Sequence, residues 1–210
     1  MNYQVIRIVL SIFFCCLLLI AAGCTQNIQV STNMQMQNLS EKKIGYKVLV
    51  VMSKEQAEKV ILEKPGAFSD NYSFEAGKSI SVNLLNMMKI LFNEADFANE
   101  LPLKTNAYDY YILANIKRYK IEWGSTAFSQ ISMNVYIDYD LLNAKKEKVL
   151  PVLTDGSSTW QRSGGEVVAV INPFVSIFVT KSAIGDAWDR AVANSLSQWV
   201  TELQAYFKKK

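Results

Sequence analysis

The chain has 210 residues, of which 22 are Lys or Arg, 19 are Asp or Glu, and none is His. Its net charge of +3 is too small to indicate nucleic-acid binding. The lack of histidine excludes Ser/His/Asp triads, Cys/His pairs and histidine-based metal sites, so we expect neither a metal nor a cofactor.

Residues 1–23 have the order of an export signal, because Arg7 precedes an apolar run and a group of small residues. The apolar run, Ile8 to Ile20, is shorter than the roughly 20 residues that a membrane-spanning helix needs. The small residues Ala21 to Gly23 suit the extended chain at a signal-protease cut, and Cys24 follows at once. The sequence therefore predicts a signal peptide that ends before Cys24.

The segment Ala21-Ala22-Gly23-Cys24 resembles the lipobox of bacterial lipoproteins, which more often has Leu at the position of Ala21. In that family the cysteine thiol receives diacylglycerol, cleavage makes the cysteine the new amino terminus, and this terminus is acylated. The resemblance implies a lipid anchor on Cys24, since three acyl chains exceed what stable membrane anchoring requires. An uncleaved anchor helix and an ordinary cleaved signal are the alternatives.

The other cysteines fit the lipid interpretation, because Cys15 and Cys16 lie in the signal and would be removed with it. In bacterial lipoproteins an Asp after the lipidated cysteine favours retention in the inner membrane. Here Thr25 follows instead. The resemblance thus implies the periplasmic face of the outer membrane rather than the inner membrane.

Residues 24–43 are predicted to be either a tether or an edge strand. Thr25 to Ser40 carry no charge and are rich in Gln, Asn, Ser and Met, and fully extended they could reach roughly 50 Å. The competing interpretation is a strand, because apolar residues alternate with polar ones at Ile28, Val30, Met34 and Met36.

Residues 44–210 are expected to form one domain with a core that needs no disulfide. Lys47–Met52 has the composition of a buried strand, and Ser53 with Gln56 predicts a helix start and a short helix over 54–62. A polar loop is expected up to Tyr72. From Gly77 to Asn93, apolar residues at spacings of three and four predict an amphipathic helix.

The second half of the domain favours strands followed by a helix. Tyr108–Trp123 is rich in aromatic and β-branched residues. Phe128–Asn143 alternates strictly, as in an antiparallel strand with one solvated face. A turn at 143–146 leads to a strand over 148–154, and another is expected around Thr159. The last helix is predicted over 183–207, with Trp188 and Trp199 buried in its apolar stripe.

Two groups of side chains could in principle perform chemistry or bind a ligand. Asp138 and Asp140 project from one face of a predicted strand, as a glycosidase pair would require, although a solvated sheet face explains them more simply. A platform for a sugar or polymer could be formed by the aromatic residues of one predicted strand, Tyr108, Tyr110, Tyr111, Tyr119 and Trp123. Alternation, however, places Tyr111 on the face opposite to Tyr108 and Tyr110. We therefore expect no enzyme.

The uncharged segment Val167–Thr180 is the third candidate, with Asn172-Pro173 as a turn near its middle. One interpretation is a buried strand, a turn and an approach to the last helix. The other is an exposed apolar loop that contacts lipid or another protein. Its candidate contact residues are Val168, Val170, Phe174, Val175, Ile177 and Phe178.

Phe74-Glu75-Ala76-Gly77 opens a predicted helix, and Asp109-Tyr110-Tyr111-Ile112 opens a predicted strand; the long strand through Asp140-Leu141 and a closing helix follow. This order resembles small periplasmic lipoproteins with a domain like the amino-terminal domain of TolB. Lipoproteins of curli secretion and exopolysaccharide export have related domains. The resemblance implies an α/β (α+β) fold, with a mixed or antiparallel sheet against two main helices. It also implies binding to partner proteins, or ring assembly, without bond chemistry. The segment 167–180 departs from the pattern.

The sequence therefore predicts a lipid-anchored envelope lipoprotein that serves as an assembly, secretion or export accessory factor. Its expected partners are the membrane, other envelope proteins or an exported polymer, and a second copy of itself. The alternative is a periplasmic carrier that holds a lipid or another apolar ligand in a pocket under the sheet.

Overall fold

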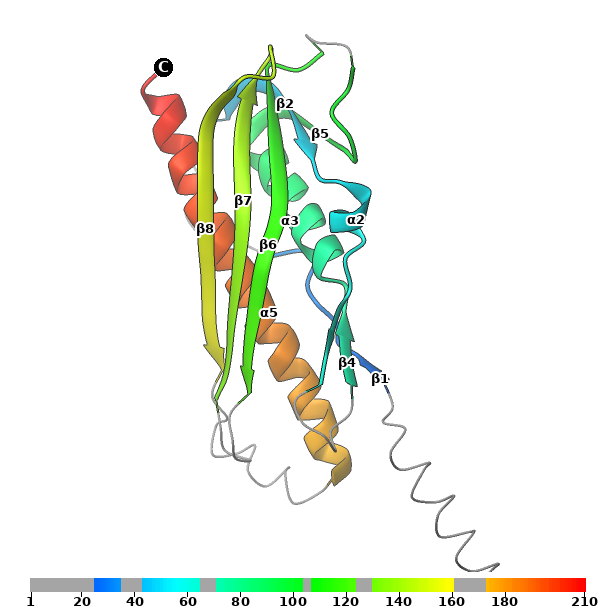
Figure 1. Cartoon of the computed structure of the whole chain (residues 1–210). Helices are drawn as coiled ribbons and strands as arrows, with labels where there is room; N and C mark the ends of the chain where they lie inside the picture. Colours follow the sequence, from blue (N-terminus) through cyan, green and yellow to red (C-terminus); the bar gives the residue numbers. More distant parts are fainter. Residues whose placement is uncertain (1–24, 35–42, 65–70, 104–106, 124–129, 161–172) are drawn as a thin grey trace, which may run out of the picture.

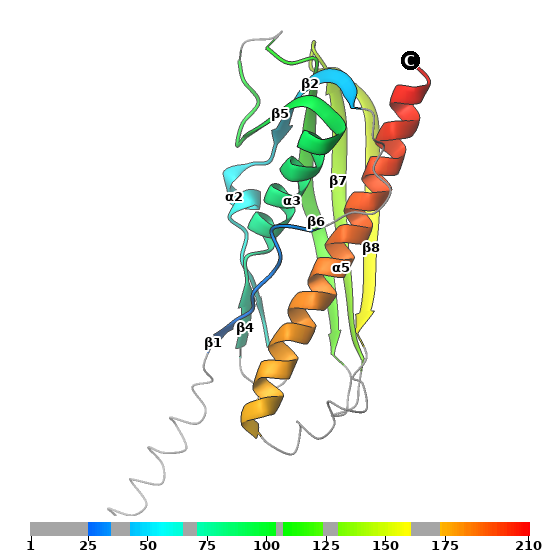
Figure 2. The ribbon, with the colours of Figure 1, turned by 180° about the vertical axis from the view of Figure 1, so that it is seen from behind.

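The computed structural model describes residues 25–34, 43–64, 71–103, 107–123, 130–160 and 173–210, with only the backbone described over 173–182. Figure 1 shows an elongated molecule in which a sheet of long strands lies against two helices, with a smaller sheet toward one end. From behind, the two helices lie in front of the sheet (Figure 2). The mixed α/β class and the single domain are confirmed.

The described strands and helices form two sheets and one helical layer. The strands are β1 (Thr25–Asn27), β2 (Ile44–Val51), β3 (Ile61–Glu63), β4 (Asn71–Phe74), β5 (Phe92–Ala98), β6 (Tyr110–Trp123), β7 (Ile131–Asn143) and β8 (Lys148–Trp160). The helices are α2 (Lys54–Ala57), α3 (Ala76–Leu91) and α5 (Pro173–Lys208). The large sheet has the order β5-β2-β6-β7-β8, and the small one has the order β1-β4-β3.

The large sheet is mixed. Strand β2 runs parallel to both β5 and β6, whereas β6, β7 and β8 form an antiparallel meander. Along β7, buried and half-buried residues alternate almost without exception, as the sequence predicts. The buried residues face the helices, and the half-buried residues lie on the opposite, solvated face, as an antiparallel sheet allows. The β7–β8 turn also forms as predicted, and the Asn143 side chain accepts bonds from the Lys145 and Glu147 amides.

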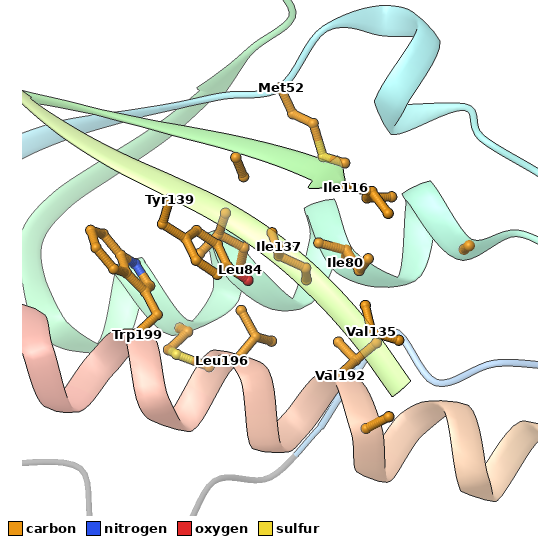
Figure 3. Packing of buried hydrophobic residues seen from close by; sticks show 14 of the residues in the cluster. Met52, Ile80, Leu84, Ile116, Val135, Ile137, Tyr139, Val192, Leu196 and Trp199 are labelled. Atoms are coloured by element: carbon orange, nitrogen blue, oxygen red, sulfur yellow. The ribbon is translucent and has the colours of Figure 1, made fainter. Parts of the chain in front are cut away.

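The core lies between the large sheet and helices α3 and α5 (Figure 3). Trp188 and Trp199 of α5 have no exposed surface, which confirms their predicted burial. The Trp199 ring stacks on Tyr139 of β7 with 5.0 Å between centroids. Gly156 brings β8 against the backbone of α5, since a Cβ there would overlap Ala191 O and lie 2.8 Å from Ser195 N. Helix and sheet therefore make close backbone contact along this stretch.

Several predicted boundaries differ from the structure. The short helix predicted over 54–62 ends at Ala57, and β3 begins at Ile61. Strand β5 was not predicted, because it follows α3 without a loop and its Asn, Glu and Asp residues disfavour strands. The two strands predicted over 148–154 and near Thr159 are one continuous strand.

The last helix begins at Pro173, ten residues before its predicted start. Residues 173–180 are therefore helical, whereas the sequence predicts over them either a turn and an approach to the last helix or a loop. Whether their side chains are buried or exposed stays a prediction. Asn172-Pro173 suggests a turn, but proline is also favoured at the first helical position, where its missing N–H leaves no bond unmade. The β-branched residues that follow have weak helix propensity, which a longer helix overrides.

Candidate functional surfaces

Residues 25–34, which the sequence presents as a tether or an edge strand, pack on the domain. Thr25 to Asn27 form β1, which pairs in parallel with β4. Ile28, directly after this strand, is buried. Strand β1 thus ends at Asn27, directly before Ile28, the first of the alternating apolar residues that predict a strand here.

Residues 28–34, here called the strap, are held by polar side chains of both long helices. The Ser31 amide donates to both carboxylate oxygens of Asp189 on α5, at 2.9 and 3.0 Å. Ser31 O accepts from Asn83 Nδ2 at 2.8 Å and from Ser79 Oγ at 3.0 Å, both on α3. The Met34 amide donates to Asn83 Oδ1 at 2.8 Å. These bonds satisfy strap backbone groups that no strand partner reaches.

The partly buried position of Asp189 disfavours the charged form of its carboxylate. Burial raises its pKa to about 6, while the Ser31 amide lowers it and the nearby charge of Asp186 raises it. The bonds from Ser31 thus only partly compensate for the loss of water around this carboxylate.

The outer face of the large sheet carries the two carboxylates that sequence analysis singled out. Asp138 is paired with Lys117 and Asp140 with Lys148, each at 2.7 Å between nitrogen and oxygen. All four side chains line one surface hollow of about 610 Å³. Because each carboxylate already has an ammonium partner, the arrangement is that of a solvated, salt-bridged sheet face.

The tyrosines near the start of β6 are divided between the two faces, although not as predicted. Tyr111 is buried on the outer face with Leu49 and Leu142. Tyr108 packs against Tyr111, with 6.0 Å between ring centroids, and so lies on the same side. The predicted alternation fails because Tyr108 precedes the strand. Tyr110, on the inner face, belongs to the core. The three tyrosines therefore do not form one platform.

The free edge of β8 is occupied by amide side chains of α5. Gln198 bonds both the N–H and the C=O of Asp155, at 3.1 and 2.8 Å, and Asn194 Nδ2 donates to Ser157 O at 2.7 Å. Pro151, further along this strand, has no N–H to donate. A strand from another protein would have to break these bonds to extend the sheet here.

A groove of about 620 Å³, here called the distal groove, lies where α5 ends, at the opposite end of the molecule from β1 (Figure 1). Its apolar lining comes from the start of β2 and the ends of both long helices, and lysines border it. The residues that carry these features are Lys43, Ile44, Tyr46, Leu91, Phe207 and Lys208.

The floor of the distal groove is an aromatic cluster. The Phe207 ring lies 5.5 Å from Tyr46, 5.0 Å from Tyr110 and 5.6 Å from Phe92, between centroids. Lys210 Nζ is 2.6 Å from Tyr110 Oη, and this hydrogen bond raises the pKa of the lysine. The sequence does not predict this surface, because the predicted strand starts at Lys47, after Ile44 and Tyr46. The aromatic pair Tyr206-Phe207 beside the C-terminal lysines is the available signal.

The remaining predicted site residues fall partly or wholly outside what the structure describes. Cys24, Val168 and Val170 lie outside the described residues. Phe174, Val175, Ile177 and Phe178 lie in the first turns of α5. Their role as contact residues therefore stays a prediction.

Within the described part of the chain, no helix is both long and apolar enough to cross a membrane. Among the same residues, no three His, Cys, Asp or Glu side chains gather closely enough to hold a metal ion.

Neither a protein-family model nor a curated protein matches the sequence. Among solved structures, protein XCC0632 from Xanthomonas campestris, described with the family DUF330, aligns at a TM-score of 0.53 and 10% identity, over 89% of this chain and 99% of its own. A candidate lipoprotein from Caulobacter crescentus aligns at 0.42 and 18% identity, over 64% and 85%. The PelC dodecamer from Paraburkholderia phytofirmans aligns at 0.31 and 17% identity, over 72% and 93%.

The first likeness shows a shared fold and nothing further, since the identity is low. The other two TM-scores lie below 0.5, so no argument rests on them. None of these three proteins is described as TolB-like, and that resemblance remains a hypothesis. The comparisons therefore establish that this chain has the fold of XCC0632.

Proposed function

We propose that the protein is a lipid-anchored lipoprotein at the periplasmic face of the outer membrane. It acts there as an accessory factor in assembly, secretion or export, by binding another envelope protein or an exported polymer. The observation that carries the proposal is Cys24, which follows Ala21-Ala22-Gly23 in a lipobox-like segment. No bond chemistry is part of the proposed role, and the salt-bridged state of Asp138 and Asp140 supports this.

The distal groove is the surface that best fits the proposed partner. It combines apolar and aromatic side chains, which contribute most to protein interfaces, with a border of Lys43 and Lys208. Tyr46 is 36% exposed at this site. The groove therefore suits a partner segment with an apolar side chain flanked by carboxylates, and charge would guide its approach.

Mass spectrometry of the mature chain tests the anchor. The wild-type protein should begin at Cys24 and carry diacylglycerol and a third acyl chain. Cys24→Ser should carry no lipid and remain uncleaved by the lipoprotein protease. An unmodified amino terminus at any other residue of the wild-type protein would refute the anchor.

Co-purification tests the accessory role. A Cys24→Ser protein expressed without the signal residues 1–23 is mixed with envelope extract, and we expect a stoichiometric protein or polymer partner to remain bound. Lys43→Glu with Lys208→Glu should reduce this binding at least tenfold, because both lysines border the groove. Lys54→Glu, which changes an exposed lysine on α2, is the control and should bind normally. Equal binding by all three proteins would remove the distal groove from the proposal.

The carrier function is the alternative, and one feature favours it. The distal groove has an apolar lining, and its volume of about 620 Å³ falls in the range of small-ligand sites. The space under the sheet, where the sequence placed the pocket, is filled by core side chains. Lipid extracted in a one-to-one ratio from the purified Cys24→Ser protein without residues 1–23 would support the carrier. Its absence together with a bound protein would support the accessory role.

A further inference from the structure

The folded domain begins one residue after Cys24. Thr25 is already paired with Asn71 in the β1–β4 register, and consecutive Cα atoms lie about 3.8 Å apart. A lipid on Cys24 therefore has no tether between itself and the domain. The end of the molecule at which β1 begins must lie at the surface of the bilayer that holds the lipid.

The start of α5 lies at the same end. Gln29 lies against Gly185, where a Cβ would be 2.5 Å from Gln29 O, and Ser31 bonds Asp189. The strap and α5 therefore run in the same direction. From Ile28 back to Cys24 the chain spans at most about 14 Å. From Gly185 back to Pro173 the helix spans about 18 Å.

Figures 1 and 2 show the same relation: the first turns of α5 (orange) extend beyond the ends of the strands, at the end where β1 lies. These distances place the start of α5 level with the anchor residue along the molecule. A helix end in this position must meet the bilayer surface or the headgroups.

The sequence of these turns suits that environment. Residues 173–180, PFVSIFVT, include no charge, and the first charged residue of the helix is Lys181. Trp123 at the end of β6 and Trp160 at the end of β8 lie in one row across the sheet, each beside Ile131. Each packs one side against the core, Trp123 on the ring of Tyr72, and remains partly exposed. Tryptophan is enriched where proteins meet the membrane interface.

We infer that this end of the molecule docks on the bilayer that holds the Cys24 lipid, through residues 173–180 of α5 and through Trp123 and Trp160. The inference rests on the proposed lipid anchor. The anchor already holds the protein at the bilayer, so the contact of the helix end with the same bilayer is intramolecular. A short apolar helix end, which would bind a membrane weakly alone, then binds at a high effective concentration. From Pro173 to Phe207 the helix spans about 51 Å. Docking would therefore hold the distal groove upright and well clear of the membrane.

Fluorescence quenching in vesicles tests the inference. The lipidated full chain is reconstituted into phosphatidylethanolamine and phosphatidylglycerol vesicles whose acyl chains carry bromine, which quenches nearby tryptophan. We expect quenching of Trp123 and Trp160 and none of the buried Trp188 and Trp199. Trp123→Phe with Trp160→Phe should therefore abolish it. Unquenched wild-type protein, or quenching that persists in this double variant, would overturn the inference.

Variants of the helix start test its part in the contact. Val175→Asp and Phe178→Asp should each lower the quenching several-fold, because a carboxylate is strongly disfavoured at an apolar surface. Thr201→Asp, at an exposed position on the same helix, is the control and should leave quenching unchanged. Circular dichroism checks the fold. If either Asp variant unfolds, the segment belongs to the core and its part in the contact is wrong.

Failure of docking and failure of the anchor give different results. If only docking fails, mass spectrometry still finds lipid on Cys24 while the tryptophans remain unquenched. If the anchor fails, Cys24 is unmodified in the wild-type protein. Sedimentation of the Cys24→Ser protein without residues 1–23 with the same vesicles then measures the second contact alone, and Phe178→Asp should weaken it.

Discussion

The two faces of the large sheet are built from the same strands but hold together in different ways. On the inner face, Tyr139 and its neighbours on β7 are buried against α5. On the outer face, Tyr136 stacks with Arg118, with 4.0 Å between guanidinium carbon and ring centroid, and Asp140 pairs with Lys148. The inner face therefore determines stability, while most of the outer face can change its residues at little cost.

The largest effect is expected from emptying the inner face. Trp199→Ala removes a ring with no exposed surface and should lower the free energy of unfolding by about 3–5 kcal/mol. Tyr136→Ala removes an aromatic ring from the outer face of the same sheet and should lower it by about 1 kcal/mol. Urea denaturation of both variants measures the difference. Equal losses would mean that the outer face is also core.

A second way to disturb the inner face is to separate β8 from α5. Gly156→Ala should lower the free energy of unfolding by about 3 kcal/mol, because the added Cβ overlaps the helix backbone at Ala191 and neither chain can rotate away. Gly45→Ala is the matched control, since among the described residues its added Cβ would meet only the Asn93 amide nitrogen, at 3.9 Å. A wild-type denaturation midpoint for Gly156→Ala would show that the helix shifts freely over the strand.

The two faces also show how far the sequence alone could lead. The alternation along β7 identified which residues point inward, and the stripe of α5 identified Trp188 and Trp199, because burial on one face leaves a periodic pattern. The strap could not be predicted, since Ser31 is held by Asp189, a residue 158 positions away. The distal groove likewise combines both ends of the domain, and no local pattern marks such a junction.

A smaller effect is expected where the strap meets α5. Asp189 has a pKa of about 6 in the folded state and about 3.9 when unfolded. The folded protein therefore binds more protons between these values. Stability should fall as pH rises from about 4 to 6 and then level off. Because the carboxylate is only partly buried, solvent screening reduces the change to about 1 kcal/mol.

Asp189→Asn should remove this slope while keeping an oxygen for the Ser31 amide. Asp186→Asn is the control. It removes the neighbouring charge that raises the pKa of Asp189, so stability should still fall with rising pH, but over a narrower pH range. Thermal unfolding between pH 4 and 7 measures both. A wild-type slope in Asp189→Asn would assign the titration to another group.

The smallest effect is expected from the outer face. Asp140→Asn breaks the ion pair with Lys148, in which the lysine side chain is 53% exposed and the carboxylate side chain 25% exposed. Because the ammonium lies in water, the loss of this partly exposed pair should change the free energy of unfolding by about 0.5 kcal/mol, and by less at high salt. Thr154→Val gives the contrast, because it removes a buried hydroxyl that bonds Ser195 Oγ at 2.6 Å and Ile137 O at 3.2 Å. It should lower the free energy of unfolding by about 1–3 kcal/mol. If Asp140→Asn instead matched Thr154→Val, the outer carboxylates would lie in a desolvated site, and the proposal of a non-catalytic sheet face would have to be abandoned.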